Sequence, residues 1–204
     1  ALSGLKRYSK PYTLGFLIVI PLMAIGMGRI KSDMFILGYM PESSEELRNH
    51  RKILQYWGNY FPLDFLIDAS DQYNFSNPSM VRALGNFQQD VENIEEIRST
   101  FSVYNLIDRS TNVILDKNLE AITANPANAQ RFLKRFLTGE NLDLSKYVSK
   151  DLKTVRVTLT GPIVSVSELE HKIDLIEGVF AKHFGSKAQI SVTSYPALFL
   201  RIMK

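Results

Sequence analysis

Three carboxylates close together in the chain are the first candidates for chemistry. Asp64, Asp68 and Asp71 supply oxygen ligands of the kind that Ca²⁺ and Mg²⁺ prefer. Asp64 and Asp68 fall on one side of a predicted strand, because successive side chains of a strand alternate between its two faces. No glycine-centred calcium-binding loop accompanies them. We therefore favour a solvated strand face over a metal site.

The three histidines do not form a catalytic or metal-binding motif. His50, His171 and His183 lie far apart, and the spacing of the last two does not put them on one helix face at ligand distance. The sequence contains none of the common zinc-protease, nucleophile-elbow, P-loop or dinucleotide motifs. We expect no enzyme activity, no metal and no cofactor.

Composition narrows the class of protein further. The chain has 204 residues and a net charge of +3, and its basic residues are spread along the sequence. A nucleic-acid-binding protein typically carries a basic stripe with interleaved aromatic residues, so we expect no nucleic-acid partner. The sequence has no cysteine, which excludes disulfides and thiolate chemistry.

Two segments of similar pattern are predicted to position these side chains. In the first, residues 61–69 alternate as a half-buried strand, and Asn77-Pro78 begins a helix with an apolar stripe. A second strand then places Ile97, Phe101 and Val103 on its apolar side. This is a β-α-β unit.

The second unit repeats the plan. Residues 154–160 alternate as a strand, and a capping box of Ser167 and Glu170 is predicted to begin a helix that ends at Gly185. A last strand alternates through Ala188, Ile190 and Val192. Two β-α-β units predict an α+β fold, a ferredoxin-like sandwich with its helices on one face of the sheet.

A helical insertion, 104–149, separates the two units. We expect two helices, Val113 to Asn125 and Pro126 to Leu137, divided by a turn at Asn125-Pro126. Phe132 and Phe136, with Leu137, form an apolar face that either lines a substrate path or docks on the domain itself. Docking is the commoner role of such a stripe.

A connecting segment precedes the first unit. Ser43 and Glu46 match a capping box, and the helix that they begin is predicted to end at Trp57 with Gly58 as its cap. Four aromatic residues close this segment and could line a ligand surface, but we favour their packing into the start of the domain. These residues are Tyr56, Trp57, Tyr60 and Phe61.

The N-terminal segment is the most apolar part of the chain. From Tyr12 to Gly28 there is no charged residue, and the apolar side chains show no amphipathic period. At 17 residues the segment is at the lower limit for crossing a bilayer. A signal peptide is disfavoured because no Ala-x-Ala cleavage site follows, and a core helix because the remaining chain is too small to wrap it. We predict a transmembrane helix.

In this order, the segments resemble the periplasmic porter domain of RND-superfamily exporters, in the predicted-exporter and MmpL-like branch. Asp33 and the Pro41-Glu42 step are similar to the family's pattern where the chain leaves the membrane. The phrases GNYFPLDFLIDA, IEEIRSTFSVYNLID and VTSYPALF resemble its strand and linking segments. The similarity covers essentially the whole chain through loose motifs in a fixed order.

The resemblance implies part of a proton-driven exporter in a bacterial inner membrane. The N-terminus would be cytoplasmic and residues 33–204 periplasmic, and the substrate would be hydrophobic or lipid-like. Expected partners are membrane lipids, the remaining transmembrane helices and the second porter domain, while homo-oligomerisation is left open. The charged residues of the proton relay would lie outside this chain.

The expected organisation has three parts: 1–32, a basic N-terminus and transmembrane helix; 33–60, a connecting helical segment; and 61–204, a porter-type domain. The porter-type domain divides into 61–103, 104–149, 150–194 and a membrane re-entry segment, 195–204. An alternative function comes from another class: a single-span protein whose extracytoplasmic domain senses or scaffolds without transport.

Overall fold

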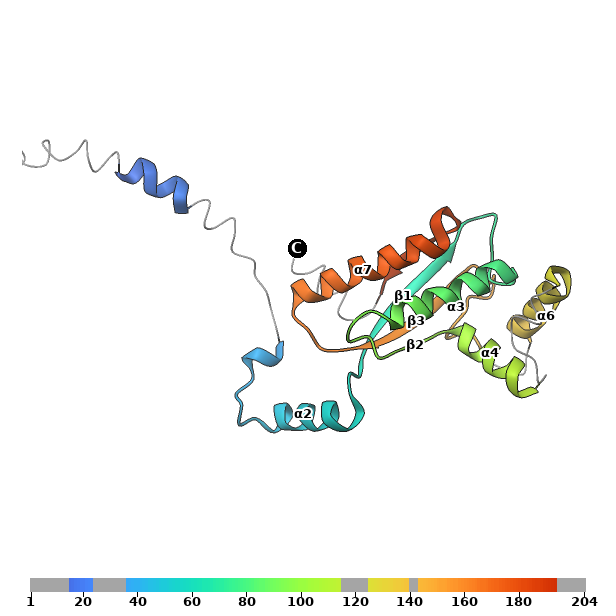
Figure 1. The fold of residues 1–204 in the computed structure, drawn as a ribbon, viewed down its shortest axis with the longest axis horizontal. Coiled ribbons are helices and arrows are strands. Elements are labelled where there is room, and N and C mark those ends of the chain that lie inside the picture. Colours follow the sequence, from blue (N-terminus) through green and yellow to red (C-terminus); the bar gives the residue numbers. More distant parts are fainter. Residues whose placement is uncertain (1–14, 24–35, 115–124, 140–142, 194–204) are drawn as a thin grey trace, which may run out of the picture. The chain divides into compact units, whose positions relative to one another are not determined.

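The computed structural model describes residues 15–23, 36–114, 125–139 and 143–193 (Figure 1). The chain forms two compact units, Ala1–Met34 and Phe35–Lys204. In the first unit, residues 15–23 form a helix whose side chains are all exposed. The rest of the predicted span, 12–14 and 24–28, lies outside the described residues. Among those that are described, no helix is both long and apolar enough to cross a membrane.

The second unit is built on a four-stranded antiparallel sheet with the strand order β2-β3-β1-β4. The strands are β1 (Phe61–Ala69), β2 (Ser99–Phe101), β3 (Thr154–Gly161) and β4 (Ala188–Val192). Phe65 pairs with Val157 on one side and with Val192 on the other. Because β3 runs opposite to both of its neighbours, β1 and β2 point the same way with β3 between them. An antiparallel sheet combined with helices makes the fold class α+β.

Two long helices connect the strands as the sequence predicts. α3 (Pro78–Glu92) joins β1 to β2, and α7 (Val166–Phe184) joins β3 to β4. The two helices pack against each other (Figure 1). The ring of Phe87 on α3 meets Phe180 and Phe184 of α7 edge-on at centroid distances of 6.0 and 6.1 Å. The β-α-β units are thus joined through one core.

The core takes one face of the sheet and one stripe of each helix. The predicted alternation in β1 and β3 is confirmed, because every second side chain is buried. The helical stripes are confirmed in the same way. The buried apolar side chains of these four elements are Leu63, Phe65, Ile67, Met80, Val81, Leu84, Phe87, Val91, Val155, Val157, Leu159, Ile173, Ile176, Phe180 and Phe184.

The prediction for β2 was wrong in both length and orientation. The strand contains only three residues, Thr100 faces inward and Phe101 is 40% exposed. Thr100 is held inward by two bonds to Glu92 Oε1, which accepts from both its backbone N–H and its hydroxyl at 2.8 Å. Val103 is not part of the strand but begins α4 (Val103–Ile114).

The insertion contains a helix that the sequence pattern did not reveal and one that it did. α4 occupies the segment where we expected strand and linker. α6 (Pro126–Thr138) is confirmed, with Asn125 as its N-cap and Gly139 at its end. Of the first predicted helix, residues 115–124 lie outside the described residues.

The connecting segment contains a short 3₁₀ helix, η1 (Ile36–Tyr39), and α2 (Glu45–Trp57). The predicted end of α2 is confirmed: Gly58, at φ +71°, donates its N–H to Leu54 and follows the last helical residue. The predicted capping box was one residue early. Ser44, rather than Ser43, accepts the N–H of Leu47 at 3.3 Å.

The capping box predicted for α7 was two residues late. Ser165 and Glu168 form it, not Ser167 and Glu170. Both pairs satisfy the motif, so spacing alone does not distinguish them. The observed choice puts Val164 before the cap and Leu169 at the fourth helical position, the pair that forms a hydrophobic staple. Both residues line one small crevice.

Candidate functional site

One concavity of the second unit lies between the turn after α3 and the first half of α7. Its volume is about 360 Å³. Its wall contains three carboxylates, an imidazole, an ammonium group and two aliphatic side chains. The lining residues are Ile94, Glu95, Glu96, Ser167, Glu168, His171, Lys172 and Leu175.

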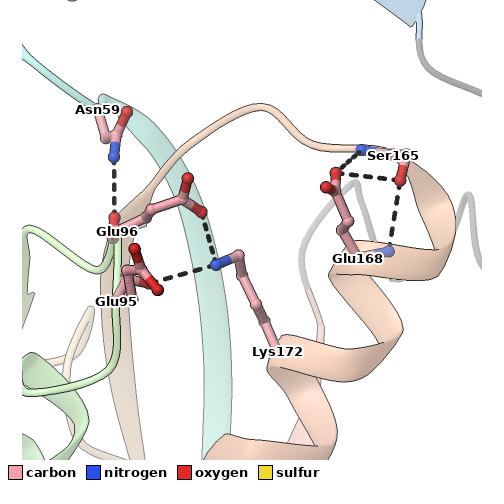
Figure 2. A network of polar contacts seen from close by, with 6 residues as sticks. All are labelled: Asn59, Glu95, Glu96, Ser165, Glu168 and Lys172. Carbon is pink, nitrogen blue, oxygen red and sulfur yellow. Dashed lines mark hydrogen bonds and ion pairs between the residues drawn. The ribbon is translucent and has the colours of Figure 1, made fainter.

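Lys172 makes two polar contacts with the turn that forms the other wall of this pocket. Its ammonium lies 2.7 Å from Glu96 Oε2 and donates to the backbone carbonyl of Glu95 at 3.2 Å (Figure 2). The side chain is only 15% exposed. A largely buried ammonium is costly without partners, and these two acceptors in the turn provide them. Lys172 therefore connects this turn to α7.

Glu96 adopts a backbone conformation that residues other than glycine rarely take. Its φ is +69°, which costs about 1 to 3 kcal/mol unless the surroundings hold it. Asn59 donates to its carbonyl at 2.9 Å, and Lys172 pairs with its carboxylate (Figure 2). The strained turn is therefore fixed from both sides.

The carboxylate of Glu168 has a structural role in the pocket wall. It accepts the backbone N–H of Ser165 at 3.1 Å, while the hydroxyl of Ser165 accepts the N–H of Glu168 at 3.4 Å (Figure 2). These bonds satisfy two N–H groups at the start of α7. Glu96 and Glu168 are thus already bonded within the wall of this acidic pocket, whose aliphatic edge is formed by Ile94 and Leu175.

A narrow apolar crevice lies next to this pocket and shares Lys172 with it. Its wall belongs to the core, including Leu63 and Leu159, and its volume is about 20 Å³. A space of that size admits no more than about one water molecule. A ligand in the acidic pocket would therefore stay at the surface of the domain.

The three carboxylates considered for a metal site each have partners on or beside β3. Asp64 accepts from Arg156 Nη2 at 2.7 Å and from the hydroxyl of Thr158 at 2.6 Å. Partial burial raises the pKa of Asp64, but the hydrogen bonds from Arg156 and Thr158, with the charge of Arg156, outweigh it and hold the pKa below its ordinary value. The carboxylate therefore stays ionised and paired.

The other two carboxylates follow the same plan. Asp68 accepts from Thr154 at 2.6 Å, and Asp71 pairs with Lys153 at 2.9 Å. The hydrogen bond from Lys153, and then its charge, hold the pKa of Asp71 below its ordinary value. Within the described ranges, no group of three His, Cys, Asp or Glu residues is placed to hold a metal ion. Asp64 and Asp68 lie on the face of β1 opposite the core, and Asp71 lies in the turn that follows the strand.

The histidines lie in three separate places. His50 Nδ1 is 2.8 Å from the hydroxyl of Tyr60, and His171 lines the acidic pocket. His183 Nε2 lies 2.8 Å from Asp90 Oδ2, which also pairs with Lys182 at 2.7 Å. The hydrogen bonds from Lys182 and His183 hold the pKa of Asp90 below its ordinary value. This cluster joins α3 to α7.

Phe132 and Phe136, the candidates for a substrate path, are neighbours on α6. Their ring centroids lie 6.0 Å apart, and both side chains are half-buried against the core. Leu137, assigned to the same face from sequence, is buried. Each ring therefore has one side packed on the domain and another accessible to solvent.

The aromatic residues of α2 are the feature that sequence reasoning judged wrongly. Tyr56 and Trp57 were expected to pack into the domain, but they are 76% and 70% exposed. Tyr39 is 75% exposed, and Ile53 and Tyr60 are also accessible. The available signal was the number of charged residues in the same helix, Glu45, Glu46, Arg48, Arg51 and Lys52, which leaves few positions for a core face.

No protein-family model matches the chain, and no curated protein matches it.

Proposed function

We propose that this chain provides one membrane anchor and an extracytoplasmic porter domain of a proton-driven RND-type exporter. The main supporting observation is the sheet order β2-β3-β1-β4, which interleaves two β-α-β units with a helical insertion between them. This is the plan of a ferredoxin-like sandwich. It agrees with the porter-domain resemblance drawn from the order of the sequence motifs.

The proposed anchor is the apolar segment from Tyr12 to Gly28. Its described part, 15–23, is helical and exposes apolar side chains all round. Such a helix suits lipid better than water. The exposed side chains are Phe16, Leu17, Ile18, Val19, Ile20, Leu22 and Met23.

On this proposal the protein resides in a bacterial inner membrane, with a cytoplasmic N-terminus and residues 33–204 in the periplasm. The substrate is hydrophobic or lipid-like and moves along the surface of the domain. The half-buried rings of Phe132 and Phe136 support such a path, because each presents aromatic surface on a helix that the core already holds. Remaining transmembrane helices and a second porter domain would complete the exporter.

The experiment is an export assay on the full-length protein with Phe132→Ser and Phe136→Ser. We expect lower export at nearly unchanged protein abundance in the membrane. Lys134→Ser is the matched control, because Lys134 is exposed on the same helix. Unfolding of both variants by urea, measured alongside, separates a lost path from a lost fold.

If export falls only in proportion to stability, the two rings act as core and the path lies elsewhere. If deletion of the protein changes no export at all, the single-span sensor or scaffold becomes the better account. An Arg substituted at Ile18 should in either case impair membrane insertion, at about 2.5 to 3.5 kcal/mol.

A further inference from the structure

Exposed aromatic residues of the second unit concentrate in one short part of the chain. Among its described residues, the exposed aromatics are Tyr39, Tyr56, Trp57, Tyr60 and Phe101, so four of these five fall between residues 39 and 60. Most other described aromatic rings of this unit are buried in, or packed against, the core. The concentration lies on and around α2.

α2 has one face directed to its own unit and another that is left accessible. Leu47 is buried, and His50 and Leu54 are half-buried. Ile53 and Trp57, one helical turn apart, are exposed beside that face. The hydrogen bond between His50 and Tyr60 joins the Tyr60 ring, which follows α2 in the chain, to the middle of this helix.

Basic residues lie on a different side of the same helix. Arg48 and Lys52 are one helical turn apart. Arg48 precedes the exposed Ile53 by five residues, and Lys52 precedes the exposed Trp57 by the same number. Five residues correspond to about 140° around an α-helix. Arg51 adds a third exposed cation, so α2 carries three cations, against the two exposed carboxylates of Glu45 and Glu46, beside its apolar aromatic stripe. Such helices lie in the interface of anionic membranes.

The position of α2 in the chain, shortly after the proposed anchor, indicates that it would meet the membrane that holds the anchor. Sixteen residues, 29–44, separate the proposed anchor from α2. Fully extended, they span at most about 58 Å, which limits how far the start of α2 can lie from the end of the proposed anchor. Trp and Tyr prefer the headgroup level because their rings are apolar and their tips polar.

We propose that α2 lies in the headgroup region of the membrane that holds the anchor. Ile53 and Trp57 insert among the lipids, and Arg48, Arg51 and Lys52 contact anionic headgroups. This inference rests on the proposed membrane anchor, but not on transport. The lipid contact would fix the distance of the porter domain from the bilayer, and hence the level at which a lipid-like substrate meets it.

The chain supplies its own probe, because Trp57 is its single tryptophan. The full chain is reconstituted in phosphatidylglycerol-containing vesicles, with and without bromine on the lipid acyl chains. We expect blue-shifted Trp57 emission, strong quenching by the brominated lipid, and several-fold weaker quenching by acrylamide than in the urea-unfolded chain. Reversing two charges with Arg48→Glu and Lys52→Glu should reduce the bromolipid quenching. Arg131→Glu with Lys134→Glu, at exposed positions of α6, should leave it unchanged.

Flotation of the same vesicles after alkaline extraction separates the two proposals. A chain that fails to float contradicts the membrane anchor and this inference together. A chain that floats while Trp57 remains open to acrylamide contradicts only the inference. Trp57 shielded from both acrylamide and bromolipid would mean that protein covers it, which also overturns the lipid contact.

Discussion

Replacing Gly85 with alanine has two physical effects that oppose each other. Gly85 lies within α3, where alanine favours the helix by about 1 kcal/mol over glycine. A methyl group at this position, however, would lie 2.4 Å from Cε2 and 2.5 Å from Cζ of Tyr104. Both distances are far inside van der Waals contact. Either the Tyr104 ring or α3 must therefore move.

The magnitude follows from these two effects. Overpacking of this kind costs about 1 to 3 kcal/mol, and Tyr104 is half-buried against the core, so its displacement disturbs packing. After the helix preference is subtracted, Gly85→Ala should lie between unchanged stability and a loss of about 2 kcal/mol. Gly178→Ala is the matched control, because it lies in α7 and nothing is within 4 Å of the added methyl. Relative to Gly178→Ala, Gly85→Ala should be about 1 to 3 kcal/mol less stable.

The assay is urea unfolding of the full chain in detergent micelles, followed by far-ultraviolet circular dichroism. Adding Tyr104→Leu to Gly85→Ala should recover part of the loss, which a double-mutant cycle measures. If Gly85→Ala stabilises the protein as much as Gly178→Ala does, the close approach of α4 to α3 is not as described.

Phe65 and Val157 are paired across β1 and β3 and both are buried, so Phe65→Ala should lower the free energy of unfolding by about 3 to 5 kcal/mol. Its effect should also couple with that of Val157→Ala, and strictly additive losses in urea unfolding would refute a shared core. The lowered pKa of Asp64 means that the unfolded chain binds more protons than the folded one below about pH 4. Stability should therefore fall as the pH drops through that range, and Asp64→Asn should flatten the dependence measured by urea titration; an unchanged slope would contradict the pairing with Arg156. In the export assay, Phe132→Ser and Phe136→Ser should lower transport more than they lower stability, and equal proportional losses would show that the rings act only as core.

The long elements could be predicted from the sequence because their burial pattern is local. β1 alternates with period two and α7 carries an apolar stripe, so each element shows its core face without reference to the rest of the chain. Alternation alone also assigns Asp64 and Asp68 to the face of β1 opposite the core, where the structure places both.

β2 could not be predicted because its orientation depends on partners elsewhere in the chain. Gln88 of α3 is buried and donates to Thr100 at 2.9 Å, while Ser102 donates to Gln88 at 2.7 Å. This hydrogen-bonded network turns Thr100 inward and leaves Phe101 outside, against their hydrophobicity. Burial of a satisfied polar network is a tertiary effect that a pattern of single residues does not contain.

The aromatic residues near α2 were misjudged for a related reason. Large aromatic side chains usually provide core area, which made packing the better prediction for Tyr56 and Trp57. Their exposure depends on which face of α2 meets the domain, and Leu47, Leu54 and His50 take that face. The acidic pocket at Lys172 was missed because it brings together a turn and a helix that are far apart in sequence.

The export claim is tested most directly by the distribution of lipids between the inner membrane and the layers outside it. Cells that lack the protein, and cells in which it is restored, are compared by lipid extraction of separated membranes, with and without a protonophore. The account predicts that at least one lipid-like species accumulates in the inner membrane without the protein. Restoration should return it to the outer layers, and the protonophore should block that return. An identical lipid distribution in all of these cells would contradict the account.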